Sequence, residues 1–304
     1  MEVEVAVFRD YEFPLDKPVN FYLVRAGSVS VLVDTGTGRT LSTQALNPSV
    51  VVLTHYHWDH SGGLVPLARS GRGALRVCAS RRTIEQLSRP SWVLEHMETV
   101  GRAVGLRAGP GERAFAEAMY SRYSAISEAA SALGVEEVGE CLSKMGVVAD
   151  WLECPGHSDD HICVELGRHL FVGDNIIGSP NVTLSNTYKY FESMTLALAR
   201  PSFATVHPGH GPGALTRTDA ASLLVETMRR KRRRLALAIA AAARGGGRWV
   251  GLDEVYRTVY PAPPNPVVAW VAARSLLGYL ASLESDGVVE VDRSRSPWRV
   301  RLMG

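Results

Sequence analysis

The stretch THYHWDH at residues 54–60 constrains this chain more than any other feature of its sequence. It follows directly after the apolar run SVVVL, which predicts a buried strand. His55 and His57 are two residues apart, so in extended backbone their imidazoles point the same way. Asp59 and His60 follow where the chain turns toward a helix. Four ligand-type side chains in so short a stretch predict a metal site at the end of this strand.

Further ligand-type residues lie downstream, each near the end of a predicted strand. They are His157 in CPGHS, Asp174 in FVGD and His210 in HPGHGP. Imidazole and carboxylate groups suit zinc, with iron or manganese as alternatives.

The distribution of strand patterns indicates the fold class. Period-two alternation or β-branched runs predict strands in two stretches of the chain, at residues 2–8, 19–25, 28–34, 49–53 and 75–79, and then at 151–154, 161–166, 170–172 and 205–206. Helical patterns lie between and after these stretches. We therefore expect an α+β fold in which two sheets pack face to face with helices outside, an αββα sandwich.

The helical pattern between the two strand-rich stretches reads as an insertion at about residues 83–148, broken near 105–111. From about Asp219 the pattern changes to three helices followed by a terminal hairpin. This order is typical of a winged helix. We therefore predict a main domain at 1–218 and a winged-helix-like domain at 219–304.

Charge is distributed unevenly along the chain. The whole chain carries a net charge of +2, whereas residues 219–304 hold 14 Lys and Arg against 8 Asp and Glu, a net of +6 that leaves −4 on the rest. The run RRKRRR at 229–234 is either a nucleic-acid patch or a solvated helix face. Six consecutive charges encircle a helix, so they cannot all share one surface.

Two observations bear on location. No run approaches the roughly 18 apolar residues that a membrane span needs. The first residues, MEVEVAVFRDYE, are charged from the second position and have no secretory signal pattern. We expect a cytoplasmic protein without a membrane partner.

The candidate ligands, in their order along the chain, resemble the metallo-β-lactamase superfamily over about residues 1–215. The resemblance implies an αββα sandwich and two zinc ions per chain. One ion would be held by His55, His57 and His157, and the other by Asp59, His60 and His210, with Asp174 bridging both. The family is one of metal-dependent hydrolases, in which a hydroxide shared by two metals attacks the substrate. Asp59 and Asp174 are the catalytic residues this implies, Asp59 orienting the hydroxide.

The resemblance also assigns roles around the ligands. Asp34 in VLVDTG matches the family's first motif and would buttress the site without binding metal. His161 would pack near the metals in a structural role. Asn20 and Tyr22 in VNFYLV would brace a loop. Tyr188, Lys189 and Tyr190 occupy a segment that passes over the pocket in such enzymes, so they are candidate substrate contacts.

The branch of the family decides the substrate. True zinc β-lactamases place a cysteine where this chain has Asp174. The stretches PGHSDDH and PGHGP are similar to the glyoxalase II-like pattern, but the tail differs from that of glyoxalase II. Its winged-helix pattern resembles the β-lactamase-like group that includes a mitochondrial single-strand endoribonuclease.

Three functions therefore stay open at this point. The first is hydrolysis of a small thioester or lactone, and the second is cleavage of single-stranded RNA. The third is a non-catalytic metal- or nucleic-acid-binding protein. In this fold the tail can also be a dimer contact, so a homo-oligomer is an alternative partner.

Overall fold

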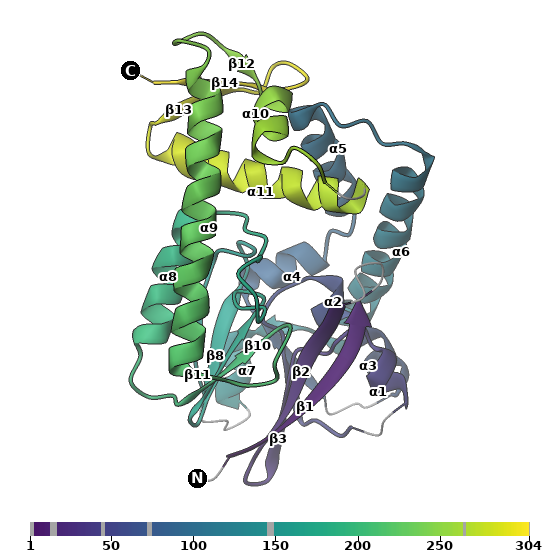
Figure 1. The fold of residues 1–304 in the computed structure, drawn as a ribbon. Coiled ribbons are helices and arrows are strands. Elements are labelled where there is room, and N and C mark those ends of the chain that lie inside the picture. Colours follow the sequence, from purple (N-terminus) through teal and green to yellow (C-terminus); the bar gives the residue numbers. More distant parts are fainter. Residues whose placement is uncertain are drawn as a thin grey trace.

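Two β-sheets lie face to face in the computed structural model, with helices on both outer sides (Figure 1). The structure describes residues 3–12, 17–43, 46–71, 75–144, 149–263 and 266–303. The predicted α+β class and the αββα sandwich are confirmed. The last residues of the predicted insertion, 145–148, lie outside the described ranges.

The first sheet has six strands, which are in spatial order β1 (Val3–Glu12), β2 (Lys17–Ala26), β3 (Val29–Val33), β4 (Val50–Val52), β5 (Arg76–Ala79) and β6 (Glu136–Glu137). The first three are antiparallel neighbours, and the strands from β3 to β6 run parallel. β4 is buried along its whole length, as its unbroken valines predict. Its carboxyl end delivers the stretch 54–60 to the edge of the sandwich.

The second sheet has five strands, which are in spatial order β11 (Leu215–Thr216), β10 (Thr205–Pro208), β9 (His169–Gly173), β8 (Ile162–Leu166) and β7 (Ala149–Glu153). β9 and β10 are parallel, while the other neighbours are antiparallel. The carboxyl ends of β9 and β10 therefore lie side by side, and candidate ligands follow both strands.

Apolar side chains from both sheets fill the space between them. Val33 and Val52 of the first sheet share one buried cluster with Ile162, Val164 and Phe171 of the second. Each fully buried side chain of this size contributes roughly 1.5–3 kcal/mol. This shared core holds the strand ends of the two sheets in fixed register with each other.

Helices cover the outer face of the first sheet. They are α1 (Arg39–Thr43), α2 (Trp58–Ser61), α3 (Leu64–Arg69), α4 (Arg81–Leu87) and α6 (Pro110–Leu133). Between α4 and α6, α5 (Trp92–Val104) packs on α6, α10 (Leu252–Val259) and α11 (Pro266–Ser285). At the end of the insertion, α7 (Val138–Lys144) contributes to the cluster between the sheets. The break predicted near 105–111 is observed, because Gly105 ends α5 in the left-handed region, with φ 70°. Met119, Tyr123 and Ile126 of α6 belong to the cluster on this face.

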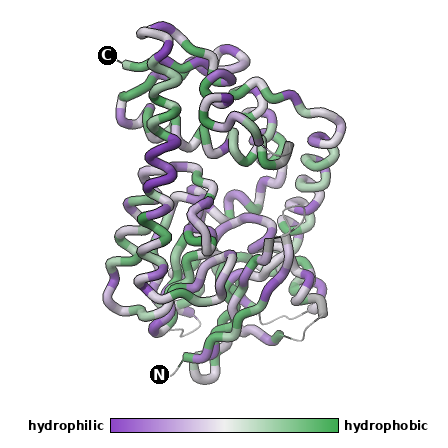
Figure 2. Tube along the Cα trace, viewed as in Figure 1, coloured by the Kyte–Doolittle hydropathy of each residue, from purple (hydrophilic) through white to green (hydrophobic). Residues whose placement is uncertain are grey.

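The second sheet is covered by α8 (Thr187–Ala199) and by the first part of α9 (Arg217–Ala243). The predicted boundary near residue 219 thus falls in the first turn of α9, a helix of 27 residues. In the middle of α9, Figure 2 shows a strongly hydrophilic stretch, which corresponds to the basic run 229–234. This helix connects the sandwich to the C-terminal part of the chain (Figure 1).

The C-terminal part adds α10 (Leu252–Val259), α11 (Pro266–Ser285) and a sheet of β12 (Val250–Gly251), β14 (Arg299–Leu302) and β13 (Val289–Asp292). The helices and the hairpin lie where the sequence predicts them. The core of this part also contains Val100, Ala103 and Val104 from α5. The winged-helix assignment and the division into two domains stay predictions.

Two disulfides join the four cysteines as Cys78–Cys141 and Cys154–Cys163. The first ties α7 to β5. Disulfides are commonest outside the reducing cytosol, so the cytoplasmic location stays a prediction. Within the described ranges, no helix has the length and apolar character needed to cross a membrane.

Candidate metal centre

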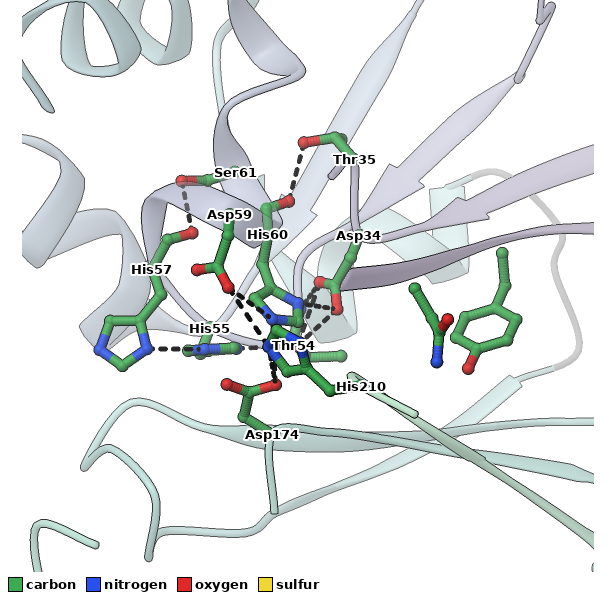
Figure 3. Close-up of polar contacts among 12 residues, drawn as sticks. Asp34, Thr35, Thr54, His55, His57, Asp59, His60, Ser61, Asp174 and His210 are labelled. Carbon is green, nitrogen blue, oxygen red and sulfur yellow. Dashed lines mark hydrogen bonds and ion pairs between the residues drawn. The ribbon is translucent and has the colours of Figure 1, made fainter. Parts of the chain in front are cut away.

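The seven side chains that the sequence marks as ligands converge at one edge of the sandwich. β4 leads into His55 and His57, while α2 carries Asp59 and His60 (Figure 3). The other three come from the second sheet: His157 follows β7, Asp174 follows β9, and His210 follows β10. All seven are buried or nearly so.

Their donor atoms form two groups that share one carboxylate. Within each group, the donor atoms lie within 4.8 Å of one another. We call these groups site A, made of His55, His57, His157 and Asp174, and site B, made of Asp59, His60, Asp174 and His210. No other group of this kind occurs in the part of the chain that the structure describes.

In site A, His57 presents Nδ1 to its neighbours. This atom lies 3.0 Å from Nε2 of His55 and 2.8 Å from Nε2 of His157. Asp174 closes the group, with Oδ2 3.4 Å from Nε2 of His157. Burial, followed by the neighbouring histidines, lowers the pKa of His55 well below its ordinary value, and burial lowers that of His157 to about 4. The imidazoles are therefore neutral, as metal ligands must be.

In site B, Nε2 of His60 lies 3.0 Å from Oδ1 of Asp174, and Nε2 of His210 lies 3.3 Å from the same atom. Nε2 of His210 is also 3.3 Å from Oδ2 of Asp59. Burial alone would lower the pKa of His210, but Asp174 and Asp59 raise it to about 10. The surrounding carboxylates thus favour positive charge at this position, which a cation can supply in place of protons.

The outer ring nitrogens are held by hydrogen bonds. Nδ1 of His157 donates to the carbonyl of Thr183 at 2.7 Å, and Nδ1 of His210 donates to the carbonyl of Pro18 at 2.8 Å. A carbonyl only accepts, so Nδ1 carries the proton and Nε2 keeps its lone pair facing the site. Such second contacts orient metal-binding imidazoles.

One observation tests whether these residues fit a metal pair. Nε2 of His60 and Oδ1 of Asp174 are both buried and 3.0 Å apart, yet neither has a hydrogen-bond partner. Buried polar atoms without partners are costly, so native proteins rarely keep them. A set of imidazole nitrogens and carboxylate oxygens with such orphaned atoms fits divalent transition metals.

Asp34 lies behind site B and does not belong to either group. Its Oδ2 is 2.8 Å from Nδ1 of His60, and its Oδ1 accepts from the backbone N–H of Thr54 at 2.8 Å. The hydroxyl of Thr54 bonds the same carboxylate and lies 3.0 Å from Nδ1 of His55. Asp34 has φ 58°, a conformation rare outside glycine. The strained backbone thus lies at Asp34, whose carboxylate contacts His60 of site B directly and His55 of site A through Thr54.

The loop that carries His210 is braced by the first sheet. The side-chain amide of Asn20 donates to the carbonyls of Pro208 and Gly211, and the Tyr22 hydroxyl donates to that of Pro208 at 2.5 Å. Gly209 sits against the site itself, because a Cβ there would lie 2.3 Å from Oδ1 of Asp174. The loop leaves no space for a side chain at this position.

The remaining residues singled out by the sequence lie at different depths. His161 is buried, stacks on His55 with ring centroids 4.8 Å apart, and has no partner for its Nε2. Tyr190 is also buried, and its hydroxyl donates to the carbonyl of Asn175. Tyr188 and Lys189 are exposed on α8. Contact of these three α8 residues with substrate stays a prediction, since none of them lines the cavity described next.

A cavity of about 690 Å³ opens beside site A, between α4, α5 and α11. Tyr56 and Ser158, which line it, are the chain neighbours of His57 and His157. The wall also contains Arg274 of α11, whose Nη1 and Nη2 both lie 3.4 Å from Nε2 of His57. The sequence did not single out Arg274, because it lies 217 residues from His57 and belongs to no motif.

Comparison with known proteins agrees with this geometry. Residues 15–234 match the family model of the metallo-beta-lactamase superfamily. The chain is 25% identical over 289 residues to the lactamase-like protein nscB of Trichophyton equinum, covering 89% of this chain and 73% of that protein. It is 26% identical over 207 residues to the thioesterase pkgB of Emericella nidulans, covering 64% of this chain and 46% of that protein.

Two solved structures share the fold along nearly the whole chain. A metallo-beta-lactamase family protein from Thermus thermophilus is 21% identical, with a TM-score of 0.69 and 98% of each chain covered. A beta-lactamase domain protein from Burkholderia ambifaria is 17% identical, with a TM-score of 0.71, covering 98% of this chain and 91% of that one. The C-terminal part is therefore included in the shared architecture.

Proposed function

The chain belongs to the metallo-beta-lactamase superfamily of hydrolases, and we propose that it uses two zinc ions, held in sites A and B, to hydrolyse a small thioester or lactone. The observation that carries the proposal is the pair of buried ligand groups that share Asp174. A single carboxylate between two groups partly neutralises two cations that lie close together.

The chain's own residues have separate tasks in this reaction. When bound, the metals supply Lewis acidity and lower the pKa of water enough to provide hydroxide near neutral pH. Asp174 belongs to both sites, whereas Asp59 belongs to site B alone, where its carboxylate would also orient the water that the metals activate. Asp34 fixes the ring of His60, and the Thr183 carbonyl fixes that of His157.

The cavity favours a small substrate. Its volume of about 690 Å³ suits a ligand of drug-like size, and such pockets bury most of their ligand. Trp92 of the insertion and Trp298 of the terminal hairpin contribute apolar wall. The similarity to a thioesterase agrees with an ester of this kind.

Single-stranded RNA is the weaker candidate. The exposed arginines of the basic run do not line the cavity, and two of them, Arg229 and Arg230, already pair with Glu226. A polynucleotide would also meet a catalytic body whose net charge is negative.

Elemental analysis together with one variant tests the proposal. Protein refolded or expressed with zinc should contain close to two zinc ions per chain, and Asp174→Ala should lose at least one of them. Hydrolysis of acyl-N-acetylcysteamine thioesters and acyl-homoserine lactones should fall by orders of magnitude in this variant. Asp150→Ala, which removes an exposed carboxylate on β7, is the matched control and should keep both metals and full activity. A metal content near zero in the parent protein would refute the proposal.

A further inference from the structure

Arg274 places a positive charge beside site A, on the side that faces the cavity. Nδ1 of His57 is directed at the other ligands, whereas Nε2 of the same ring is directed at the guanidinium, 3.4 Å away. Both terminal nitrogens of Arg274 lie at this distance, so the guanidinium presents its two-nitrogen end to the site. The side chain is half-buried and forms part of the cavity wall.

Within the described ranges, no carboxylate lies within ion-pair distance of Arg274. Other arginines of the C-terminal part are paired: Arg293 with Glu284, Arg257 with Asp253 at 2.9 Å, and Arg299 with Asp292 at 3.0 Å. A guanidinium that is partly withdrawn from water gains from a carboxylate partner, because charge-assisted hydrogen bonds are among the stronger polar contacts in proteins. The Tyr56 hydroxyl is a hydrogen-bond partner of Arg274 but carries no charge. A carboxylate partner for Arg274 has to come from outside the described chain.

His57 cannot serve as that partner when it binds metal. Coordination through Nδ1 leaves the proton on Nε2, so the imidazole then presents a donor. A guanidinium also only donates. The Tyr56 oxygen can accept from the guanidinium but is neutral, whereas an anionic oxygen group beside the two donors can accept from both.

The remaining wall limits the charge of that acceptor to about one unit. Burial, followed by the charge of Arg274, lowers the pKa of His96 to about 4, so this imidazole adds no second positive charge. Arg293 is neutralised by Glu284, and Arg82 donates to the carbonyl of Asp159. Glu85, Glu95 and Asp159 bring negative charge to the same wall. A phosphate dianion would lack sufficient positive charge beside these carboxylates, whereas a carboxylate matches the Arg274 guanidinium in charge and in its planar, two-oxygen geometry.

We propose that Arg274 makes this enzyme selective for ester substrates whose acyl group carries a free carboxylate, which binds from the cavity side against both the guanidinium and Nε2 of His57. The proposal rests on the proposed function, since it concerns the substrate of the same metal centre. It assigns the C-terminal helix α11 a direct part in substrate selection.

A pair of matched substrates tests the proposal. The N-acetylcysteamine thioester of glutaric acid carries a free carboxylate, and the thioester of its methyl ester is neutral but otherwise alike. Release of the thiol is followed with a chromogenic disulfide reagent on the zinc-loaded enzyme. The parent should prefer the anionic substrate, and Arg274→Gln should raise KM for it by about 10- to 100-fold, the value of a charge-assisted contact. The neutral substrate should be hydrolysed equally by both proteins.

Two further variants separate this role from general effects. Arg274→Lys keeps the charge without the planar fork, so it should recover part of the preference. Arg257→Gln removes one positive charge from the surface of α10 and should leave the preference unchanged. Equal KM values for the two substrates in the parent, or an equal loss on both in Arg274→Gln, would overturn the proposal while leaving the hydrolase assignment intact.

A binding measurement tests whether Arg274 binds a carboxylate, independently of catalysis. Glutarate titrated calorimetrically into the zinc-loaded parent should bind about 10- to 100-fold more tightly than into Arg274→Gln. The difference supports the role of Arg274 even if neither thioester is hydrolysed, a result that would count against the proposed reaction alone. Identical affinities would refute the role of Arg274.

Discussion

Replacement of Asp34 by asparagine tests how strongly the residues behind site B control the metals. The change keeps the size of the side chain, and asparagine tolerates the positive φ of 58° at this position. Its oxygen can still accept from the backbone N–H of Thr54. Its amide NH₂ group, however, replaces the carboxylate oxygen that lies 2.8 Å from Nδ1 of His60.

The expected size of the effect follows from that one contact. Nδ1–H of His60 and the new amide are both donors, so the contact is lost or the proton moves to Nε2, the atom that faces the metal. Loss of such an outer contact typically costs about 10- to 100-fold in metal affinity. That range corresponds to about 1.4–2.8 kcal/mol for the ion in site B.

Zinc affinity is measured by competition with a chromophoric chelator on metal-free protein. The parent should bind two equivalents, and Asp34→Asn should bind one of them about 10- to 100-fold more weakly, as the loss of the outer contact requires. Asp10→Asn is the control, because Asp10 is also a buried carboxylate that accepts several hydrogen bonds, from Thr37 and Thr40, but lies outside the site. It should lower stability and leave zinc binding unchanged. Unchanged affinity of both ions in Asp34→Asn would refute the reasoning.

Three further predictions concern other parts of the molecule. Gly209→Ala should weaken zinc binding in the same competition assay, since its Cβ would lie 2.3 Å from Oδ1 of Asp174; unaltered binding would contradict the tight packing. Burial, followed by Arg234, lowers the pKa of Lys231 from 10.5 to about 8, so the unfolded chain binds more protons between these values. The free energy of unfolding should therefore rise with pH between about 8 and 10.5, by roughly 2–3 kcal/mol, and Lys231→Met should remove this rise in urea titrations at pH 8 and 10. Neutralising the exposed arginines of the basic run should flatten the salt dependence of any binding to single-stranded RNA, and RNA affinity equal to that of the parent would exclude the run as an anchor; these residues are Arg229, Arg230, Arg232 and Arg233.

Local sequence patterns predict the metal-binding residues because each of these residues follows the end of a strand. The spacing of His55 and His57, and the glycines around His157 and His210, are encoded within a few residues. Once the two sheets pack through their shared core, the strand ends must meet, and the ligands meet with them. The resemblance implies that Asn20 and Tyr22 brace a loop, and the structure identifies that loop as the one that carries His210.

The cavity beside site A depends on contacts between distant parts of the chain, which no local sequence pattern encodes. Arg274 reaches His57 only because α11 packs across the chain onto α5 and α8. The pairing of Cys78 with Cys141, 63 residues apart, likewise depends on the packing of α7 against β5. The basic run is less exposed than its sequence indicates, since Lys231 is buried and donates to the carbonyl of Val182, and Arg234 donates to that of Val259.

The position of α11 couples ligand binding to the assembly of the whole chain. Gly278 lies so close to Leu184 that a Cβ would be 2.4 Å from its carbonyl oxygen, and Ser282 accepts from the backbone N–H of Thr187 at 3.1 Å. The cavity exists only while this helix is seated on the sandwich. A ligand that occupies the cavity therefore stabilises the seated arrangement, by about 2.7 kcal/mol when its free concentration is about a hundred times Kd. A higher substrate concentration would thereby stabilise the packing of α11 on the sandwich.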